Sequence, residues 1–201
     1  MEMPDELLHR QAALQSEANA VCGDLGLDQL LSFVGDPVRV GSSALGLMIR
    51  RDVDITVICL KLDRVTMEAV AGIGARLATH QRVWQVRFRD DTGRWNTDPD
   101  HYPDGLYLGV DYRSPEEYDW NLDIWFVDEP DRQPDLAHLT TILPRLTSEA
   151  RMAILRIKHA WVDRAEGGPR VRGFDVYRSV LDDQVRTPEQ FDQWRIRQTK
   201  T

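Results

Sequence analysis

Three aspartates on two segments of alternating polarity are the residues best suited to chemistry. Asp52 and Asp54 lie in the segment 52–57, where polar and apolar residues alternate, and Asp123 lies in a second such segment at 119–127. Side chains two apart on a strand project from the same face, so both segments place their aspartates on the polar face. Neighbouring carboxylates repel each other unless a cation lies between them, and hard oxygen ligands suit Mg²⁺. Three carboxylates on one open face can hold two metal ions, one for an attacking oxygen and one for leaving phosphates.

A glycine–serine pair precedes these aspartates in the chain. Gly41 and Ser42 follow a predicted strand at 37–40 and begin a segment, 41–51, that is expected to be a loop. The pair offers backbone N–H groups and a hydroxyl close to where a triphosphate on the metal would lie. Glycine at positions 41 and 46 lets the backbone approach an anion without a Cβ in the way.

The order of these motifs resembles the nucleotidyltransferase superfamily of the DNA polymerase β type: Gly-Ser, nine residues, Asp-x-Asp, and a third aspartate on a later strand. Its small bacterial members are the most similar in character, namely the aminoglycoside and lincosamide nucleotidyltransferases and the minimal nucleotidyltransferases. The match covers residues 38–58 and 119–127. The resemblance implies a mixed sheet with helices on one face, followed by a helical annex.

The same resemblance implies a role for each motif residue. Gly41 and Ser42 would hold the triphosphate of a nucleotide, and Asp52 and Asp54 would bind the metal ions. Asp123 would complete the metal site and could serve as base for the acceptor hydroxyl, so Asp54 and Asp123 are the expected catalytic residues. The implied reaction is in-line transfer, in which Mg²⁺ neutralises the triphosphate and lowers the pKa of the acceptor hydroxyl.

Other side chains have both a functional and an ordinary interpretation. In related enzymes a basic residue on the helix after the third carboxylate contacts the triphosphate, which would assign this role to Lys158; alternatively its stem covers apolar surface and its head reaches water. Tyr177 could line the acceptor cleft or belong to the core. Trp125 shares the face of Asp123 and could stack on a base or a substrate ring, or be covered by helices. The histidines show no metal-site spacing and are expected at the surface: His9, His80, His101, His138 and His159.

The elements that must position these groups follow from the periodicity of the sequence. Period-two alternation predicts strands at 52–57, 83–89, 106–113 and 119–127. In the second of these, the expected buried set is Trp84, Val86 and Phe88. Alternation predicts that helices cover one face of the sheet and leave the other open, because a fully buried parallel sheet would give continuous apolar runs.

Helical spacing of apolar residues predicts helices on both sides of these strands. The predicted ranges are 4–22, 63–80, 148–165 and about 174–185, with a third C-terminal helix from the capping box that begins at Thr187. The predicted fold class is α+β: a mixed β-sheet with helices on one face, followed by a small C-terminal helical annex. The predicted domains are a core at 1–130, which includes the N-terminal helix, and a helical region at 131–201.

Charge and composition restrict the partners. The 201 residues contain 25 Lys and Arg against 33 Asp and Glu, which gives a formal net charge of −8. Such a chain repels a polyanion, so long nucleic acid is not expected as the acceptor, and a small cationic molecule or a protein fits better. No apolar stretch is long enough to span a membrane, and the start of the chain does not resemble a signal peptide, so a cytoplasmic location is expected.

The sequence therefore predicts a Mg²⁺-dependent nucleotidyltransferase that moves a nucleoside monophosphate from a nucleoside triphosphate, with ATP the expected donor, to a hydroxyl of a small molecule such as an aminoglycoside. One alternative is a protein acceptor, as in toxin–antitoxin pairs. A second is a non-catalytic nucleotide-binding protein of the same fold, and a third is an enzyme that tails RNA. Subunits of the superfamily often pair to complete a cleft, so a homodimer is one expected arrangement.

Overall fold

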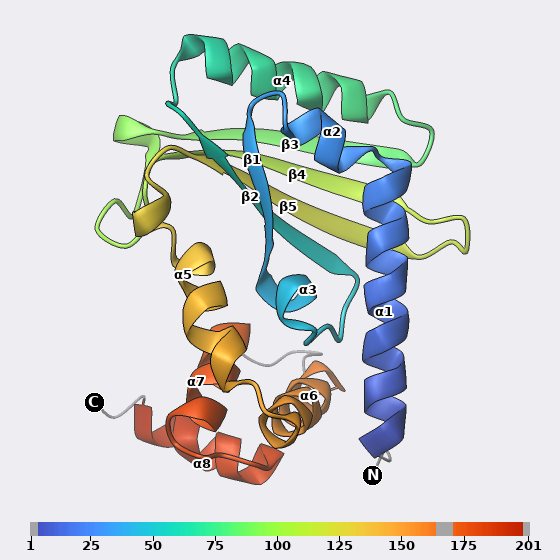
Figure 1. Cartoon of the computed structure of the whole chain (residues 1–201), viewed down its shortest axis with the longest axis vertical. Coiled ribbons are helices and arrows are strands. Elements are labelled where there is room, and N and C mark those ends of the chain that lie inside the picture. Colours follow the sequence, from blue (N-terminus) through green and yellow to red (C-terminus); the bar gives the residue numbers. More distant parts are fainter. Residues whose placement is uncertain (1–3, 164–170, 199–201) are drawn as a thin grey trace.

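A five-stranded mixed β-sheet forms the centre of the computed structural model, which describes residues 4–163 and 171–198 (Figure 1). The strand order is β1-β2-β5-β4-β3; β2 and β5 run parallel, and the other neighbouring pairs run antiparallel. The strands are β1 (Gly35–Val40), β2 (Asp52–Cys59), β3 (Val83–Asp91), β4 (Gly105–Arg113) and β5 (Asp119–Val127). The α+β class and the mixed sheet predicted from the sequence are confirmed.

Helices precede, interrupt and follow the strands. They are α1 (Pro4–Asp24), α2 (Leu27–Leu31), α3 (Gly41–Leu45), α4 (Arg64–Ala78), α5 (Pro134–Ile142), α6 (Ser148–Asp163), α7 (Gly173–Leu181) and α8 (Pro188–Gln198). Short 3₁₀ turns lie at Gly93–Trp95, Pro130–Arg132 and Leu143–Arg145.

Helices α1, α2 and α4 cover one face of the sheet. Val53 and Val57 of β2 are fully buried and share one hydrophobic cluster with Ala18 of α1, Leu31 of α2 and Val70 of α4. The alternating residues of β4 and β5 join the same cluster, which explains their period of two. The polar residues between them, including the aspartates of β2 and β5, therefore lie on the opposite face.

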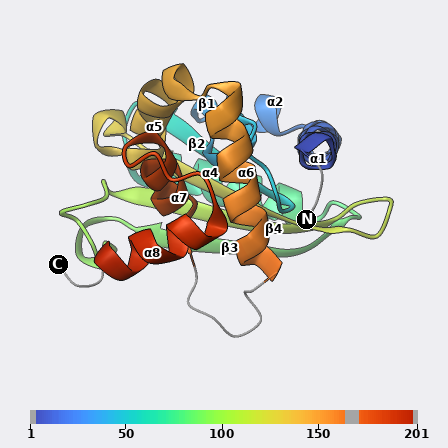
Figure 2. The ribbon, with the colours of Figure 1, turned by 90° about the horizontal axis from the view of Figure 1, so that it is seen from below.

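Helices α5 to α8 form a second hydrophobic cluster together with the segment around α3. Ile154 of α6, Val176 of α7 and Phe191 of α8 are almost fully buried and share this cluster with Leu45 and Leu47. In Figure 1 this group lies below the sheet, and Figure 2 shows it from below. Since Leu45 and Leu47 belong to the first 130 residues, the cluster draws on both predicted domains, and the boundary at residue 130 stays a prediction.

The helices of the structure differ from the predicted ones at three places. Helix α5 was not predicted, because the sequence PDLAHLTTI contains two threonines and has little amphipathic pattern. The segment after β1 begins with the short helix α3 rather than a loop. Helix α7 ends at Leu181 instead of about residue 185, because the chain turns through a left-handed Gln184 (φ 55°).

Strand β3 differs from the prediction in its burial. Val86 packs against the main cluster, but Trp84 is 61% exposed and Phe88 is 42% exposed. Strand β3 is at the edge of the sheet, and its pairing with β4 is irregular between Val83 and Gln85. The helices therefore cover only part of this strand, and the alternation in its sequence overestimates its burial.

None of the helices in the described ranges has both the length and the apolar content needed to cross a bilayer.

Candidate active site

The parallel pairing of β2 with β5 places the predicted carboxylates side by side. Asp54 lies directly opposite Asp123, and Asp52 lies opposite Asn121. Because residues opposite each other in a ladder project from the same face, the three aspartates share the face that α1, α2 and α4 leave uncovered. The shared face predicted from the period-two pattern is therefore present.

The glycine at position 41 makes room for one of these carboxylates. Gly41 has a left-handed backbone conformation (φ 63°), and a Cβ built on it would overlap the Oδ2 oxygen of Asp54. Any other residue would strain the backbone and displace the carboxylate. The next residue, Ser42, is 8% exposed, and its hydroxyl makes no hydrogen bond to a described residue.

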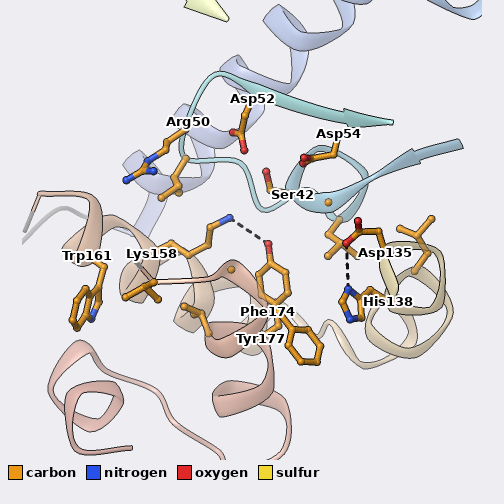
Figure 3. A pocket seen from close by; sticks show the side chains of 17 residues that line it. Ser42, Arg50, Asp52, Asp54, Asp135, His138, Lys158, Trp161, Phe174 and Tyr177 are labelled. Atoms are coloured by element: carbon orange, nitrogen blue, oxygen red, sulfur yellow. Dashed lines mark hydrogen bonds and ion pairs between the residues drawn. The ribbon is translucent and has the colours of Figure 1, made fainter. Parts of the chain in front are cut away.

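A pocket of about 310 Å³ lies between these residues and the C-terminal helices (Figure 3). Five of the six predicted site residues line it: Gly41, Ser42, Asp52, Asp54 and Lys158. Its other walls come from α5, α6 and α7 and from the segment before β2, with Arg50, Asp135, His138, Phe174 and Tyr177 among the lining residues. The structure thus gathers residues more than 100 positions apart around one cavity.

Arg151 fixes α6 against the end of α3. Its Nη1 donates hydrogen bonds to the carbonyl oxygens of Leu45 and Gly46 at 2.6 and 2.7 Å. Gly46 adopts φ 64°, and a Cβ there would lie 2.7 Å from Nη1 of the same arginine. The contact between α3 and α6 therefore depends on a glycine at the end of the short helix, and it sets where Lys158 of α6 enters the pocket.

Lys158 reaches from α6 into the pocket. Its Nζ donates to the carbonyl oxygen of Leu47 at 2.6 Å and to the hydroxyl of Tyr177 at 3.3 Å. An ammonium group has three donors, so one remains for a ligand. Burial lowers the pKa of Lys158 to about 8, although Asp52 and Asp54 oppose this shift. The charged head is thus held inside the pocket instead of extending into water, which had been the ordinary interpretation.

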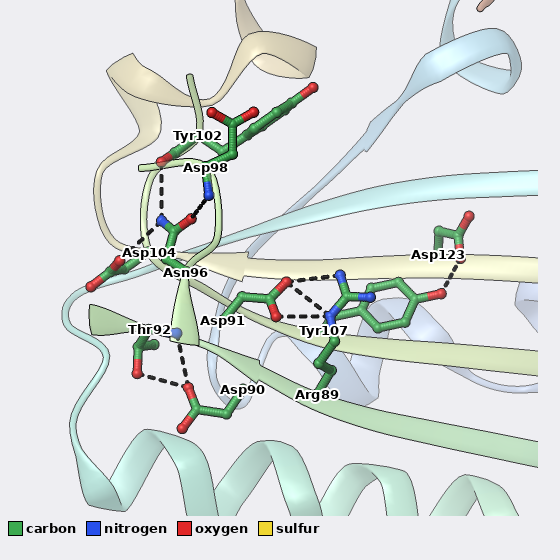
Figure 4. Close-up of polar contacts among 10 residues, drawn as sticks. All are labelled: Arg89, Asp90, Asp91, Thr92, Asn96, Asp98, Tyr102, Asp104, Tyr107 and Asp123. Atoms are coloured by element: carbon green, nitrogen blue, oxygen red, sulfur yellow. Dashed lines mark hydrogen bonds and ion pairs between the residues drawn. The ribbon is translucent and has the colours of Figure 1, made fainter. Parts of the chain in front are cut away.

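Asp123 does not line the pocket, and one of its oxygens is already occupied. The hydroxyl of Tyr107 donates to Asp123 Oδ1 at 2.5 Å (Figure 4). Burial, together with this hydrogen bond, raises the pKa of Tyr107 to about 12, so the phenol remains a donor at neutral pH. Within 4–163 and 171–198, no group of three acidic, histidine or cysteine side chains could hold a metal ion as they stand. The metal site formed by all three aspartates stays a prediction.

No protein-family model and no curated protein matches the chain. Solved structures match it: Cid1, an RNA terminal uridylyl transferase, is 17% identical, with a TM-score of 0.56 over 83% of this chain and 46% of its own. A cytoplasmic RNA terminal U-transferase is 15% identical, with a TM-score of 0.53 over 83% of this chain and 45% of its own. A variant of the Cid1 poly(U) polymerase bound to MgATP is 15% identical, with a TM-score of 0.53 over 88% and 50% of the two chains. The chain has the nucleotidyltransferase fold. It spans about half the length of these structures.

The carboxylates of Asp52 and Asp54 are buried close to other negative charges. Burial is the largest cause that raises the pKa of Asp54, to about 7, and the charges of Asp52, Asp123 and Asp135 add to it. Burial also raises the pKa of Asp52, against the lowering effects of Lys158 and Arg50. Without a cation, Asp54 is therefore about half protonated near pH 7.

The pocket residues fit a divalent metal ion. No side chain in the described part of the chain donates a hydrogen bond to the carboxylates of Asp52 and Asp54, so their oxygens are available to a ligand. Two adjacent carboxylates of raised pKa are stabilised by a cation, and carboxylate oxygens are the ligands that Mg²⁺ prefers. Asp123, opposite Asp54 in the ladder, would join them through its Oδ2 oxygen, because Tyr107 occupies only Oδ1.

Two residues of the unpredicted helix α5 also face the pocket. Asp135 contributes a third negative charge that acts on Asp54, after Asp52 and Asp123, and its Oδ1 lies 3.7 Å from Nδ1 of His138. The ring of His138 stacks on Phe174 at 4.3 Å, so it is not the plain surface residue expected from the sequence. His159 is also buried, at 8% exposure. Tyr177 lines the pocket, and Trp125 lies on the same face of the sheet as Asp123.

Proposed function

We propose that the chain is a metal-dependent nucleotidyltransferase that transfers a nucleoside monophosphate from a nucleoside triphosphate to a hydroxyl group. The observation that carries this proposal is the pocket itself, where Asp52 and Asp54 face Lys158 across one cavity. A pair of carboxylates opposite a single ammonium suits a ligand that is anionic and carries its own metal ion. The fold is shared with structures of nucleotidyltransferases, one of them bound to MgATP.

Each pocket residue then has a role in binding the donor. Ser42 and the backbone N–H groups after Gly41 hydrogen-bond the triphosphate, and Lys158 offers its remaining N–H to the same group. Asp52 and Asp54, with Asp123, would hold Mg²⁺, which when bound neutralises the triphosphate and polarises the reacting phosphate. The aromatic wall at Phe174 is suited to the base of the nucleotide.

The chemical step is an in-line displacement. The acceptor oxygen forms a bond to the α-phosphorus, the bond from this phosphorus to the bridging oxygen of the β-phosphate breaks, and pyrophosphate leaves. The proton of the acceptor hydroxyl passes to Asp123, the carboxylate next to Asp54 on the open face. No nucleophilic side chain is needed, because the protein acts by positioning and by charge.

The acceptor that we favour is a small cationic molecule, because the chain carries a net charge of −8. RNA is the second candidate, since the similar structures are of RNA terminal uridylyl transferases, one of them in complex with the product ApU. The expectation that long nucleic acid is disfavoured therefore rests on charge alone. A protein acceptor and a non-catalytic nucleotide-binding role are the remaining alternatives.

Calorimetric titration of ATP, GTP and UTP, each with and without Mg²⁺, tests the donor site. We expect metal-dependent binding by the wild type and loss of that binding in Asp54→Ala. Asp36→Ala serves as the matched control, because Asp36 is an exposed strand aspartate outside the pocket. Equal MgATP binding by Asp54→Ala and the wild type would contradict the proposal.

A further inference from the structure

Beside the pocket, the open face of the sheet forms an ordered array of side chains. The ladders place Arg89 of β3, Tyr107 of β4 and Trp125 of β5 in one row. The next row contains Gly109 and Asp123. The aromatic row thus lies directly next to the carboxylate that would accept a proton from the acceptor.

Gly109 lets Tyr107 lean from its own row toward Asp123. A Cβ at position 109 would lie 2.5 Å from the Tyr107 hydroxyl and 3.0 Å from Nε of Arg87. The space above this glycine is therefore filled by the tyrosine, whose hydroxyl donates to Asp123 Oδ1 (Figure 4). A hydroxyl donor on this oxygen occupies the position that an acceptor hydroxyl would need.

The rings of this row form a continuous surface. Tyr107 and Trp125 have ring centroids 5.1 Å apart, and the Arg89 guanidinium lies 4.8 Å from the first ring and 5.4 Å from the second. Trp125 also packs over Gly105, where a Cβ would come within 3.1 Å of the indole. Gly105 begins β4 directly after the loop 92–104, so this loop borders the aromatic surface.

The charges around this surface are predominantly negative. Arg89 is paired with Asp91 at 2.8 Å, and Arg87 is paired with the buried Asp111 at 3.3 Å. These guanidinium groups are therefore neutralised by their own carboxylates. The neighbouring loop 92–104 adds three more aspartates and one arginine: Asp98, Asp100, Asp104 and Arg94. A phosphate chain would be repelled here, whereas an ammonium group would be attracted.

We infer that Tyr107 and Trp125 form the acceptor site, for a hydroxylated ring compound that carries ammonium groups, such as an amino sugar. The ring of the acceptor packs on Trp125, and its ammonium groups face the aspartates of the loop 92–104. Its hydroxyl replaces that of Tyr107 on Asp123. Tyr107 thus protects Asp123 until the acceptor arrives. This inference rests on the proposed nucleotidyl transfer and names the acceptor class of that same site.

The test measures acceptor binding without turnover. The full chain is saturated with Mg²⁺ and an ATP analogue whose α,β-bridge is a methylene group, and neomycin B is titrated calorimetrically as the probe. Trp125→Leu should weaken neomycin binding about tenfold, since a ring contact of this kind is lost. Tyr107→Phe should strengthen it about two- to tenfold, because the acceptor no longer competes with the phenol hydroxyl for Asp123.

Two control variants make the result specific. Trp84→Leu removes a tryptophan that is 61% exposed elsewhere in the sheet, and it should leave neomycin binding unchanged. Trp125→Phe keeps a ring and should restore most of the affinity that Trp125→Leu loses, which a folding defect would not explain. Binding of MgATP is measured for every variant, and all of them should retain it.

Three outcomes would overturn the inference while MgATP binding stays intact. The first is that Trp125→Leu binds neomycin with the same affinity as Trp84→Leu. The second is that an octamer of riboadenylate binds instead of neomycin and that its binding depends on Trp125, which would assign the surface to RNA. The third is that the wild type binds neither probe, which would exclude the proposed class of acceptor. Failure of the wild type to bind MgATP would instead contradict the proposed function, so the two failures are distinguishable.

Discussion

The carboxylate of Asp54 occupies the space beside Gly41 that the side chain of any other residue at position 41 would fill. Gly41→Ala should therefore push this carboxylate out of the pocket and strain a backbone with φ 63°. We expect a loss of about 1–2 kcal/mol in the free energy of unfolding and at least tenfold weaker MgATP binding. Chemical denaturation and calorimetry measure the two effects.

Gly72→Ala is the matched control for this substitution. Gly72 lies within α4, and a Cβ there would meet no atom within 4 Å. Because alanine favours helix more than glycine, this variant should be more stable by roughly 0.5–1 kcal/mol, with unchanged MgATP binding. Equal behaviour of the two variants would contradict the role given to Gly41.

Asp54 should destabilise the metal-free protein near neutral pH. Its pKa is raised to about 7 in the folded chain, above the value of about 3.9 expected when unfolded. The stability that the protonated group contributes is fully present below pH 4 and is lost as the pH rises through 7. Without metal and above pH 7, the free energy of unfolding of Asp54→Asn should therefore exceed that of the wild type by roughly 2–4 kcal/mol.

Thermal unfolding in EDTA, at pH values from 4 to 8, measures this difference, with Asp36→Asn as the control at an exposed strand position. The difference in stability between Asp54→Asn and the wild type should increase with pH, whereas the difference between Asp36→Asn and the wild type should not. Saturating Mg²⁺ should reverse the order, because only the wild type then gains binding energy. A gap that does not change with pH would contradict the raised pKa.

The titration of Asp54 should also make the affinity for Mg²⁺ depend on pH. Since Asp54 must be deprotonated to bind Mg²⁺, the affinity should rise about tenfold per pH unit below 7 and level off above it. Asp135→Asn removes a charge that raises the pKa of Asp54, so it should move this midpoint to lower pH. Calorimetry between pH 5.5 and 8 checks both curves; an affinity independent of pH would exclude Asp54 as a metal ligand.

The sequence predicts the fold class and the common face of the three aspartates because both depend on a period of two. Strand alternation fixes which side Asp52, Asp54 and Asp123 occupy, and the helices that cover the other side follow from their own apolar stripes. That shared face needs no knowledge of strand order, since each strand carries its own polarity.

The remaining features depend on contacts that no local pattern contains. The bond from Tyr107 to Asp123 requires the register between β4 and β5 and the open space above Gly109. Asp135 and His138 were missed because α5 has a weak helical pattern, although its proline at the first helical position is a start signal. Alternation predicts a buried Trp84, which is 61% exposed, because a period of two does not indicate that a strand is at the edge of the sheet.

Lys158 should give nucleotide binding an alkaline limit. Its pKa is lowered to about 8, so its positive charge, and with it the attraction for a triphosphate, is lost as the pH rises through 8. Affinity for ATP should therefore fall above pH 8, and Lys158→Met should abolish this fall while weakening binding about ten- to hundredfold at pH 7. Binding of adenosine should change little, because the ammonium acts on phosphate. The exposed Lys61 provides the control, as Lys61→Met should keep both the affinity and the alkaline limit. Retention of the alkaline limit in Lys158→Met would assign it to another group and contradict the contact between Lys158 and the triphosphate.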